Sequence, residues 1–175
     1  MAVETKPKEA GGAFSGYAQP QQRPPFVSFA ALTGIFNAGF VGALLAARRS
    51  GRELPERVGA GDVILVGTAS HKLSRLIAKD KITSFLRAPF TEYEGDAGPG
   101  EVSESVRGRG LRQAIGELIA CPYCLGLWAS GALQVGLIWA PRTTRVIAST
   151  FTALTISDFL QIAYKAAEDR GLGGS

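Results

Sequence analysis

Apolar residues in this chain are gathered into long runs, and charged residues stand between the runs. The first run extends from Phe26 to Ala47 without a charged residue, and Arg48 and Arg49 follow it directly. As a helix, a run of this length would be about 33 Å long, which matches a hydrocarbon core about 30 Å thick. The run therefore predicts a transmembrane helix over residues 26–47.

Three later segments complete the expected set of membrane-embedded helices. Residues 118–140 and 146–164 are long apolar runs, the second of which is interrupted by two polar side chains. Residues 63–79 are apolar in their first half and amphipathic in their second, so this segment either spans the bilayer or lies on its surface. The pattern predicts an all-α fold, an integral membrane helical bundle with three to four membrane-embedded helices.

The remaining segments are polar. Residues 1–25 are rich in Pro, Gln and Gly and predict a disordered N-terminal tail. Residues 80–112 predict a polar loop, whose acidic side chains we expect to be solvated, and residues 167–175 predict a flexible tail. Residues 48–166 would form the membrane domain that follows the first span.

Composition and charge agree with a membrane protein. Charged residues make up 19% of the chain, below the roughly 25% of a typical soluble domain, and hydrophobic residues make up 46%. The net charge is +4, but the basic residues flank the apolar runs instead of forming one stripe, so we expect no nucleic-acid partner. We expect the lipid bilayer as partner, with anionic lipids at Arg107, Arg109 and Arg112.

The distribution of Lys and Arg predicts the orientation of a multi-pass protein in a plasma membrane. With three spans and the N-terminus outside, 14 basic residues lie inside and 5 outside. With four spans and the N-terminus inside, the numbers are 13 and 6. Both arrangements place residues 80–112 and the C-terminus in the cytoplasm, and they differ on the side of the N-terminus.

Both cysteines of the chain lie in one C-x-x-C motif at the start of the third apolar run. Pro122 is expected to open that helix, which places Cys121 and Cys124 on one face of its first turn. This geometry fits a redox dithiol, or half of a zinc site with His71 and Glu117 as the other candidate ligands. Packing of two small apolar side chains explains the motif without any cofactor.

Asp158 lies within the last apolar run, where an unpaired carboxylate is costly. The amphipathic half of residues 63–79 offers Arg75, Lys72 and His71 as partners, and we predict an ion pair between Asp158 and Arg75. Such a pair would fix the register of two helices, and a proton or ion relay is the alternative.

Gly34, Ala38 and Gly42 recur at every fourth position of the first run and form one stripe of small residues. Such a stripe lets another helix approach closely, so it predicts a packing surface and a homo-oligomer. Ordinary small-residue content would produce the same pattern.

Five short strings and one tryptophan carry a resemblance to a known family: HKLSRLIAKD from His71, RAPF from Arg87, GEL from Gly116, CPYCLG from Cys121, SDFLQ from Ser157, and Trp128. They look like a family of bacterial membrane proteins catalogued as domain of unknown function 1360, some members of which are labelled sporulation-associated. The resemblance covers roughly residues 62–166. It implies a bacterial plasma-membrane location and no established activity.

No motif in the chain fixes a reaction or a substrate. The sequence therefore predicts a non-enzymatic membrane protein with a structural or accessory role. The alternative is a membrane thiol-disulfide or metal-binding protein that uses Cys121 and Cys124, and a weaker one is a transporter subunit that uses Asp158.

Overall fold

The computed structural model describes Tyr17 and residues 24–172. The tail predicted over residues 1–25 lies almost entirely outside this part, as do the last three residues of the tail predicted over residues 167–175. The described elements are mostly helical, in the order α1 (Phe26–Arg49), α2 (Ala60–Ala78), the short 3-10 helix η2 (Lys81–Thr83), α3 (Ser84–Arg87), β1 (Thr91–Gly98), β2 (Glu101–Val106), α4 (Leu111–Ala120), α5 (Pro122–Trp139) and α6 (Pro141–Leu172).

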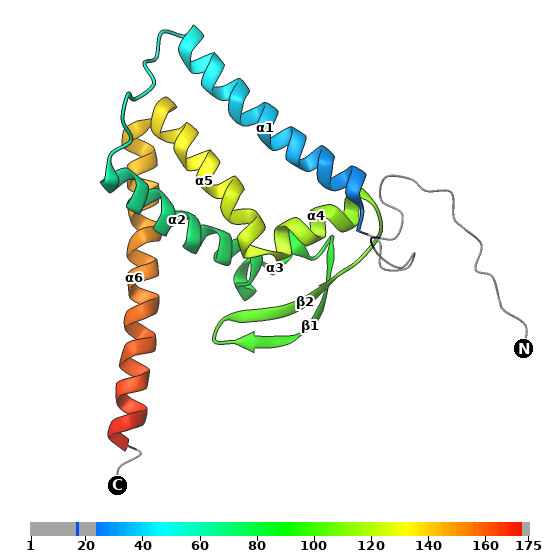
Figure 1. The fold of residues 1–175 in the computed structure, drawn as a ribbon. Coiled ribbons are helices and arrows are strands. Elements are labelled where there is room, and N and C mark those ends of the chain that lie inside the picture. The colour runs from blue at the N-terminus through cyan, green and yellow to red at the C-terminus, as the bar shows by residue number, and fades with distance from the viewer. Residues whose placement is uncertain (1–16, 18–23, 173–175) are drawn as a thin grey trace, which may run out of the picture.

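Helices α1 and α5 lie against each other and run in the same direction (Figure 1). Near the middle of α1, the ring of Phe36 packs on Trp128 with 5.2 Å between the centroids. Just past the end of α1, the guanidinium of Arg52 lies 5.0 Å from the ring centroid of Trp139 at the end of α5. The contacts thus advance along both helices together.

Helices α2 and α6 form a second parallel pair. Their first contact is the ion pair between Asp62 and Arg145, with 3.2 Å between the charged atoms. Further along, the Thr155 hydroxyl donates to the Thr68 carbonyl at 3.3 Å. Small side chains and threonines allow this close approach, because they leave room for backbone carbonyls to accept side-chain hydrogen bonds.

The bundle has two different ends (Figure 1). The connector end holds residues 50–59, which join α1 to α2, and the turn between α5 and α6. The hairpin end holds the start of α1, the end of α2, both strands and the junction of α4 with α5. Because α2 returns antiparallel to α1, the start of α1 and the hairpin lie at the same end.

Little of the apolar surface is buried inside the chain. The core cluster consists of Val66, Ala69, Leu133 and Ala148. In the described part, α1 and α6 are long and apolar enough to cross a membrane, yet the most apolar windows of these helices are only 0% and 11% buried. Helices α4 and α5, bent by 83° at their junction, would make a third span if counted as one.

The expectation of an all-α fold with a polar loop over residues 80–112 is wrong in one respect. Strands β1 and β2 form an antiparallel hairpin within that segment, paired from Thr91 with Val106 to Gly98 with Glu101. The turn is Pro99-Gly100, in which Gly100 adopts φ +78°, a conformation that glycine reaches without strain. The strands are rich in Glu, Ser and Gly, which favour strands weakly, so the sequence pattern hid them.

The last helix is longer than the apolar run that predicts it. It begins at Pro141 instead of residue 146 and continues to Leu172 instead of residue 164. Pro is favoured in the first turn of a helix, which explains the early start. The Lys165–Asp169 pair, four residues apart with 4.0 Å between its charged atoms, supports the polar extension.

The small-residue stripe of α1 faces away from the other helices of the chain. Helix α1 turns Phe36 and Phe40 toward α5, and a Cβ atom built on Gly34 or Gly42 would meet nothing within 4 Å. The close approach is made instead by Gly131 of α5, where a Cβ atom would lie 2.9 Å from the ring of Phe36.

We therefore expect Gly131→Leu to separate α1 from α5 and to lower the free energy of unfolding in detergent by about 1–3 kcal/mol, the usual effect of overpacking. Gly34→Leu is the matched control, because its side chain enters open space. Thermal unfolding of the two variants would contradict this packing if Gly34→Leu were the more damaging change.

Candidate functional site

The second half of α2 carries two cations that contact three acidic side chains from elsewhere in the chain. The Lys72 ammonium lies 2.8 Å from the Asp158 carboxylate of α6 and 3.9 Å from that of Asp80. One turn later, the Arg75 guanidinium is paired with Glu101 at the start of β2. We call these five residues the charged layer.

The charged layer lies well inside the apolar length of α6. Asp158 follows Val146 by 12 residues, which is about 18 Å of helix. Around it, the side chains of Ile156, Phe159 and Leu160 are all more than half exposed. The Lys72 side chain is 15% exposed and that of Asp158 is 46% exposed, so the pair is open on one side.

The structure pairs Asp158 with Lys72, one of the three candidate cations, instead of with the predicted Arg75. Because α2 and α6 run parallel with Asp62 level with Arg145, Lys72 comes level with Asp158 and Arg75 lies one turn beyond it, against the hairpin. The third candidate cation, His71, lies on the exposed side of α2.

Beside the charged layer, Arg87 is fully buried. Its Nε donates to Glu104 at 2.6 Å, and Nη2 donates to the same carboxylate at 3.3 Å and to the Asp80 carbonyl at 3.1 Å. Its Nη1 donates to the Ile77 carbonyl and to the Thr83 hydroxyl. All five N–H donors of a guanidinium are thereby used, so this group holds the structure together and has none left for a ligand.

We call the buried pair of Arg87 and Glu104 the arginine centre. It joins α2, the turn after it and both strands, because the Thr91 hydroxyl of β1 also lies within hydrogen-bond distance of Glu104 and donates to the Arg87 carbonyl. In the sequence, Arg87 stands out only as part of the family resemblance, and Glu104 belongs to the acidic residues that were expected to be solvated. The arginine of the RAPF string could have indicated a functional position. Its partner Glu104, 17 residues later, carries no mark in the sequence that identifies it as the partner.

The tip of the hairpin is tied to η2 by an exposed cluster. The Asp96 carboxylate accepts hydrogen bonds from the Lys81 ammonium and the Tyr93 hydroxyl, both at 3.0 Å. The hydrogen bond from Lys81 is the main reason that the pKa of Asp96 lies below its ordinary value. Its contribution to stability is present above the ordinary carboxyl pKa and is lost as the pH falls through the lowered one.

Cys121 and Cys124 lie where α4 bends into α5. Cys121 is the N-cap of α5, and its sulfur accepts a hydrogen bond from the Cys124 backbone N–H at 3.2 Å. Pro122 occupies the first turn, which confirms the expectation that it opens the helix. Both thiols are free, and that of Cys124 is exposed.

The four zinc candidates are not brought together. Among the described residues, no group of three or more His, Cys, Asp and Glu side chains is placed to hold a metal ion. Glu117 accepts a hydrogen bond from Gln113 at 2.8 Å, within α4. The cysteines and His71 belong to different helices, and His71 is exposed.

Two of the three arginines expected at anionic lipid are engaged with the backbone. Arg107 donates to the Ala88 carbonyl at 2.6 Å, and Arg112 donates to the Pro89 carbonyl at 2.6 and 3.0 Å. Arg109 is exposed. These contacts hold the turn between α3 and β1 against the start of α4.

Residues 65–164, more than half of the chain, match a protein family described as "Protein of unknown function (DUF1360)". The chain belongs to this family. Two relatives come from Bacillus subtilis (strain 168). The first, Sporulation protein YjcA, is 39% identical over 74 residues, which are 41% of this chain and 63% of that protein. The second, UPF0713 protein YngL, is 33% identical over 81 residues, 45% of this chain and 59% of that protein.

The chain thus spans about three fifths of the length of the curated relatives that it matches. No solved structure matches the chain. The DUF1360 segment contains the charged layer, the arginine centre and both cysteines, whereas α1 and the connector precede it. The matched segment therefore covers β1, β2, α4 and α5 completely, and α2 and α6 in part.

Proposed function

We propose that this DUF1360 protein is an integral, non-enzymatic protein of the bacterial plasma membrane, with a structural or accessory role. The observation that carries the proposal is the outward surface of α1 and α6, which is apolar although the described residues cover almost none of it. Val27 and Ile35 of α1 are 84% and 60% exposed, and Ile162 of α6 is 66% exposed. Exposed apolar surface on this scale is stable in lipid and would cause association in water.

The direction of α2 supports the arrangement with four embedded helices. In that arrangement the connector end, with six of the described Lys and Arg residues, faces outward, and the hairpin end together with the end of α6, with ten, faces the cytoplasm. The charged layer then lies toward the cytoplasmic half of the membrane. There, a Lys–Asp pair with access to interfacial water costs far less than at the bilayer centre.

The structural role that we infer is to present the β-hairpin in a fixed position beneath the membrane. Arg75 and Lys72 attach the hairpin and the turn after α2 to the helices, and the arginine centre stiffens the segment between them. All the N–H donors of Arg87 are taken up, so the arrangement supports positioning better than chemistry.

Extraction of membranes with alkaline carbonate tests the proposal. We expect the full-length chain to remain in the membrane pellet and to require detergent for release, because α1 and α6 cannot leave lipid without exposing apolar side chains. Release into the carbonate supernatant would show a peripheral protein and would contradict the proposal.

A membrane dithiol is the second candidate function. It is favoured by the position of Cys121 as N-cap of α5, where its sulfur accepts the Cys124 backbone N–H, and by the exposed thiol of Cys124 beside it. Alkylation of the purified protein followed by mass measurement would show two additional labels after reduction if the pair is oxidised in cells. Equal labelling with and without reductant would remove this candidate.

A further inference from the structure

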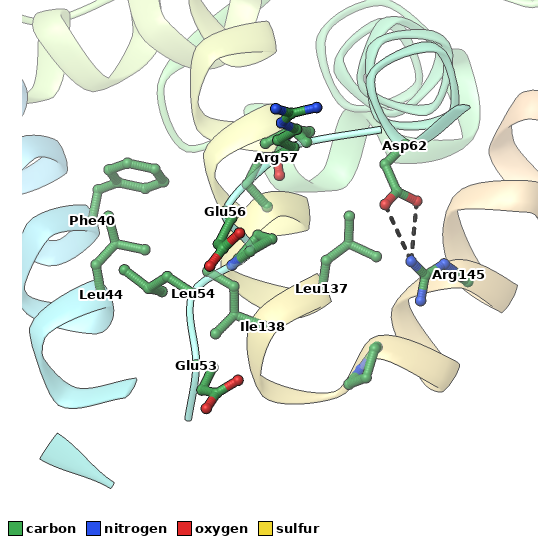
Figure 2. A pocket seen from close by; sticks show the side chains of 14 residues that line it. Phe40, Leu44, Glu53, Leu54, Glu56, Arg57, Asp62, Leu137, Ile138 and Arg145 are labelled. Atoms are coloured by element: carbon green, nitrogen blue, oxygen red, sulfur yellow. Dashed lines mark hydrogen bonds and ion pairs between the residues drawn. The ribbon is translucent and has the colours of Figure 1, made fainter. Parts of the chain in front are cut away.

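The connector end carries a pocket of about 910 Å³, none of whose lining residues belongs to the charged layer (Figure 2). This volume lies at the upper part of the range of about 300–1,000 Å³ that is usual for ligand pockets. The wall comes from α1, α5 and the start of α6, and residues 53–58 of the connector pass across it. The connector and α1 precede the segment that matches the DUF1360 family.

Apolar side chains from three elements line the pocket. Phe40 and Leu44 of α1 contribute to it from one wall, and Leu137 and Ile138 of α5 contribute from the other (Figure 2). Leu54 enters from the connector between them. A surface of this kind takes up hydrocarbon.

Charged side chains line the pocket among these apolar ones (Figure 2). Asp62 and Arg145 are paired with each other, with both carboxylate oxygens 3.2 Å from one guanidinium nitrogen, so they largely neutralise each other. Glu53, Glu56 and Arg57 are exposed on the connector. Throughout residues 24–172, the structure gives these three side chains neither a hydrogen bond nor an ion pair, which leaves two carboxylates and one guanidinium for a ligand.

The neighbourhood of the pocket is that of a membrane surface. Arg52 lies over the ring of Trp139, and this tryptophan ends the apolar helix α5. Tryptophan and arginine are enriched at the level of lipid headgroups. Arg48 and Arg49 end α1 at the same end of the bundle.

We propose that this pocket binds a zwitterionic phospholipid whose headgroup carries a primary ammonium group. Its phosphate pairs with Arg57, and its ammonium donates to Glu53 and Glu56. Its acyl chains lie on the apolar side chains of the pocket. The proposal rests on the proposed membrane location, because the ligand would enter from the bilayer.

The charges discriminate between headgroups. A quaternary ammonium has no N–H donor and leaves the two carboxylates without hydrogen bonds. An anionic glycerol headgroup has no cation at all and brings its phosphate close to both carboxylates. Free phosphate shares the anionic group but has no apolar part for Leu54, Leu137 and Ile138.

Binding to the full-length protein in a non-ionic detergent tests the proposal. The probes are short-chain phosphatidylethanolamine, phosphatidylcholine and phosphatidylglycerol, together with glycerophosphoethanolamine and inorganic phosphate, and native mass spectrometry measures occupancy. We expect phosphatidylethanolamine to bind about tenfold more tightly than the other two lipids, which is the effect of one lost charged hydrogen bond. Glycerophosphoethanolamine and phosphate should bind only weakly, because they lack the acyl chains.

Two variants and a control locate the site. Arg57→Gln should weaken phosphatidylethanolamine binding about tenfold, and the double change Glu53→Gln with Glu56→Gln should remove the preference over phosphatidylglycerol. Arg142→Gln, an exposed arginine at the same end that does not line the pocket, should change neither.

Equal affinity for the three lipids, binding of phosphate alone with the same affinity, or equal effects of Arg57→Gln and Arg142→Gln would overturn the proposal. These outcomes leave the carbonate extraction unaffected. A failure of the lipid site is therefore distinguishable from a failure of the membrane assignment.

Discussion

Replacing Arg87 with methionine is expected to lower the free energy of unfolding of the hairpin end by about 3–5 kcal/mol, the usual cost of removing one partner of a buried ion pair. The Glu104 side chain, only 7% exposed, would be left as an uncompensated charge. The carbonyls of Ile77 and Asp80 would also lose the hydrogen bonds that Arg87 donates to them. Hydrogen exchange of residues 80–106 would measure the loss as faster exchange across the whole segment.

Arg109→Met is the matched control for this change, because Arg109 is an exposed arginine close to the hairpin. The double variant Arg87→Met with Glu104→Met should recover part of the loss, since it removes the stranded charge. Equal exchange rates for Arg87→Met and Arg109→Met would contradict a stabilising role of the buried pair. A double variant that is the least stable of the three would contradict it as well.

Replacing Lys72 with methionine is expected to destabilise the bundle by about 2 kcal/mol, because the Asp158 carboxylate would lose its cation within the apolar length of α6. The estimate is below that for a fully buried pair, since the Asp158 side chain is 46% exposed. The change should also slow membrane insertion and reduce the amount of protein in the membrane fraction. Unfolding in detergent and quantitative immunoblotting of membranes would measure both effects.

A second change, at Asp158, tests whether the loss of the ion pair causes the destabilisation. Lys72→Met combined with Asp158→Asn should be more stable than Lys72→Met alone, because it removes the unpaired carboxylate. Lys79→Met, which removes a cation one turn beyond Arg75, should have a smaller effect than Lys72→Met. A double variant as unstable as the single one would assign the effect to packing of the lysine stem instead of to the ion pair.

Helices were predictable where apolar runs are long. Residues 26–47 predicted α1, because uncharged stretches of that length have few other stable conformations. Residues 118–140 predicted α5 but not the 83° bend before it, which leaves residues 118–120 in α4. The ends of α6 were less predictable, since a proline start and a polar extension do not change the apolar pattern that marks a helix. The sequence also indicated that Asp158 needs a cation as partner, and that the segment 63–79 could supply it.

Which cation pairs with Asp158 was not predictable, because Lys72 and Arg75 lie one turn apart on the same helix. The choice depends on how far α2 slides along α6, and that offset is set by contacts such as Thr155 on Thr68, 87 residues apart. The spacing of apolar residues along a helix predicts which face is buried, but it does not predict how far the helix is shifted along its neighbour.

The hairpin was hidden because its stability comes from a few long-range contacts. Val102 is the one apolar side chain of β2 that is buried, and charged or small residues fill most other strand positions. The contact that holds the hairpin in place joins Arg87 to Glu104, and nothing local marks those two residues as partners. Acidic residues in a glycine-rich segment are usually exposed to solvent, whereas the Glu104 side chain of this segment is buried.

Labelling of single cysteines in intact cells tests the central claim, a bundle in lipid with its hairpin end in the cytoplasm. Cys121 and Cys124 are changed to serine, and reporters are placed at exposed positions as Thr143→Cys at the connector end and Ser103→Cys in the hairpin. We predict that a membrane-impermeant maleimide labels position 143 in intact cells, and labels position 103 only after permeabilisation. Labelling of position 103 from outside, or of neither position before and both after permeabilisation, would contradict the account.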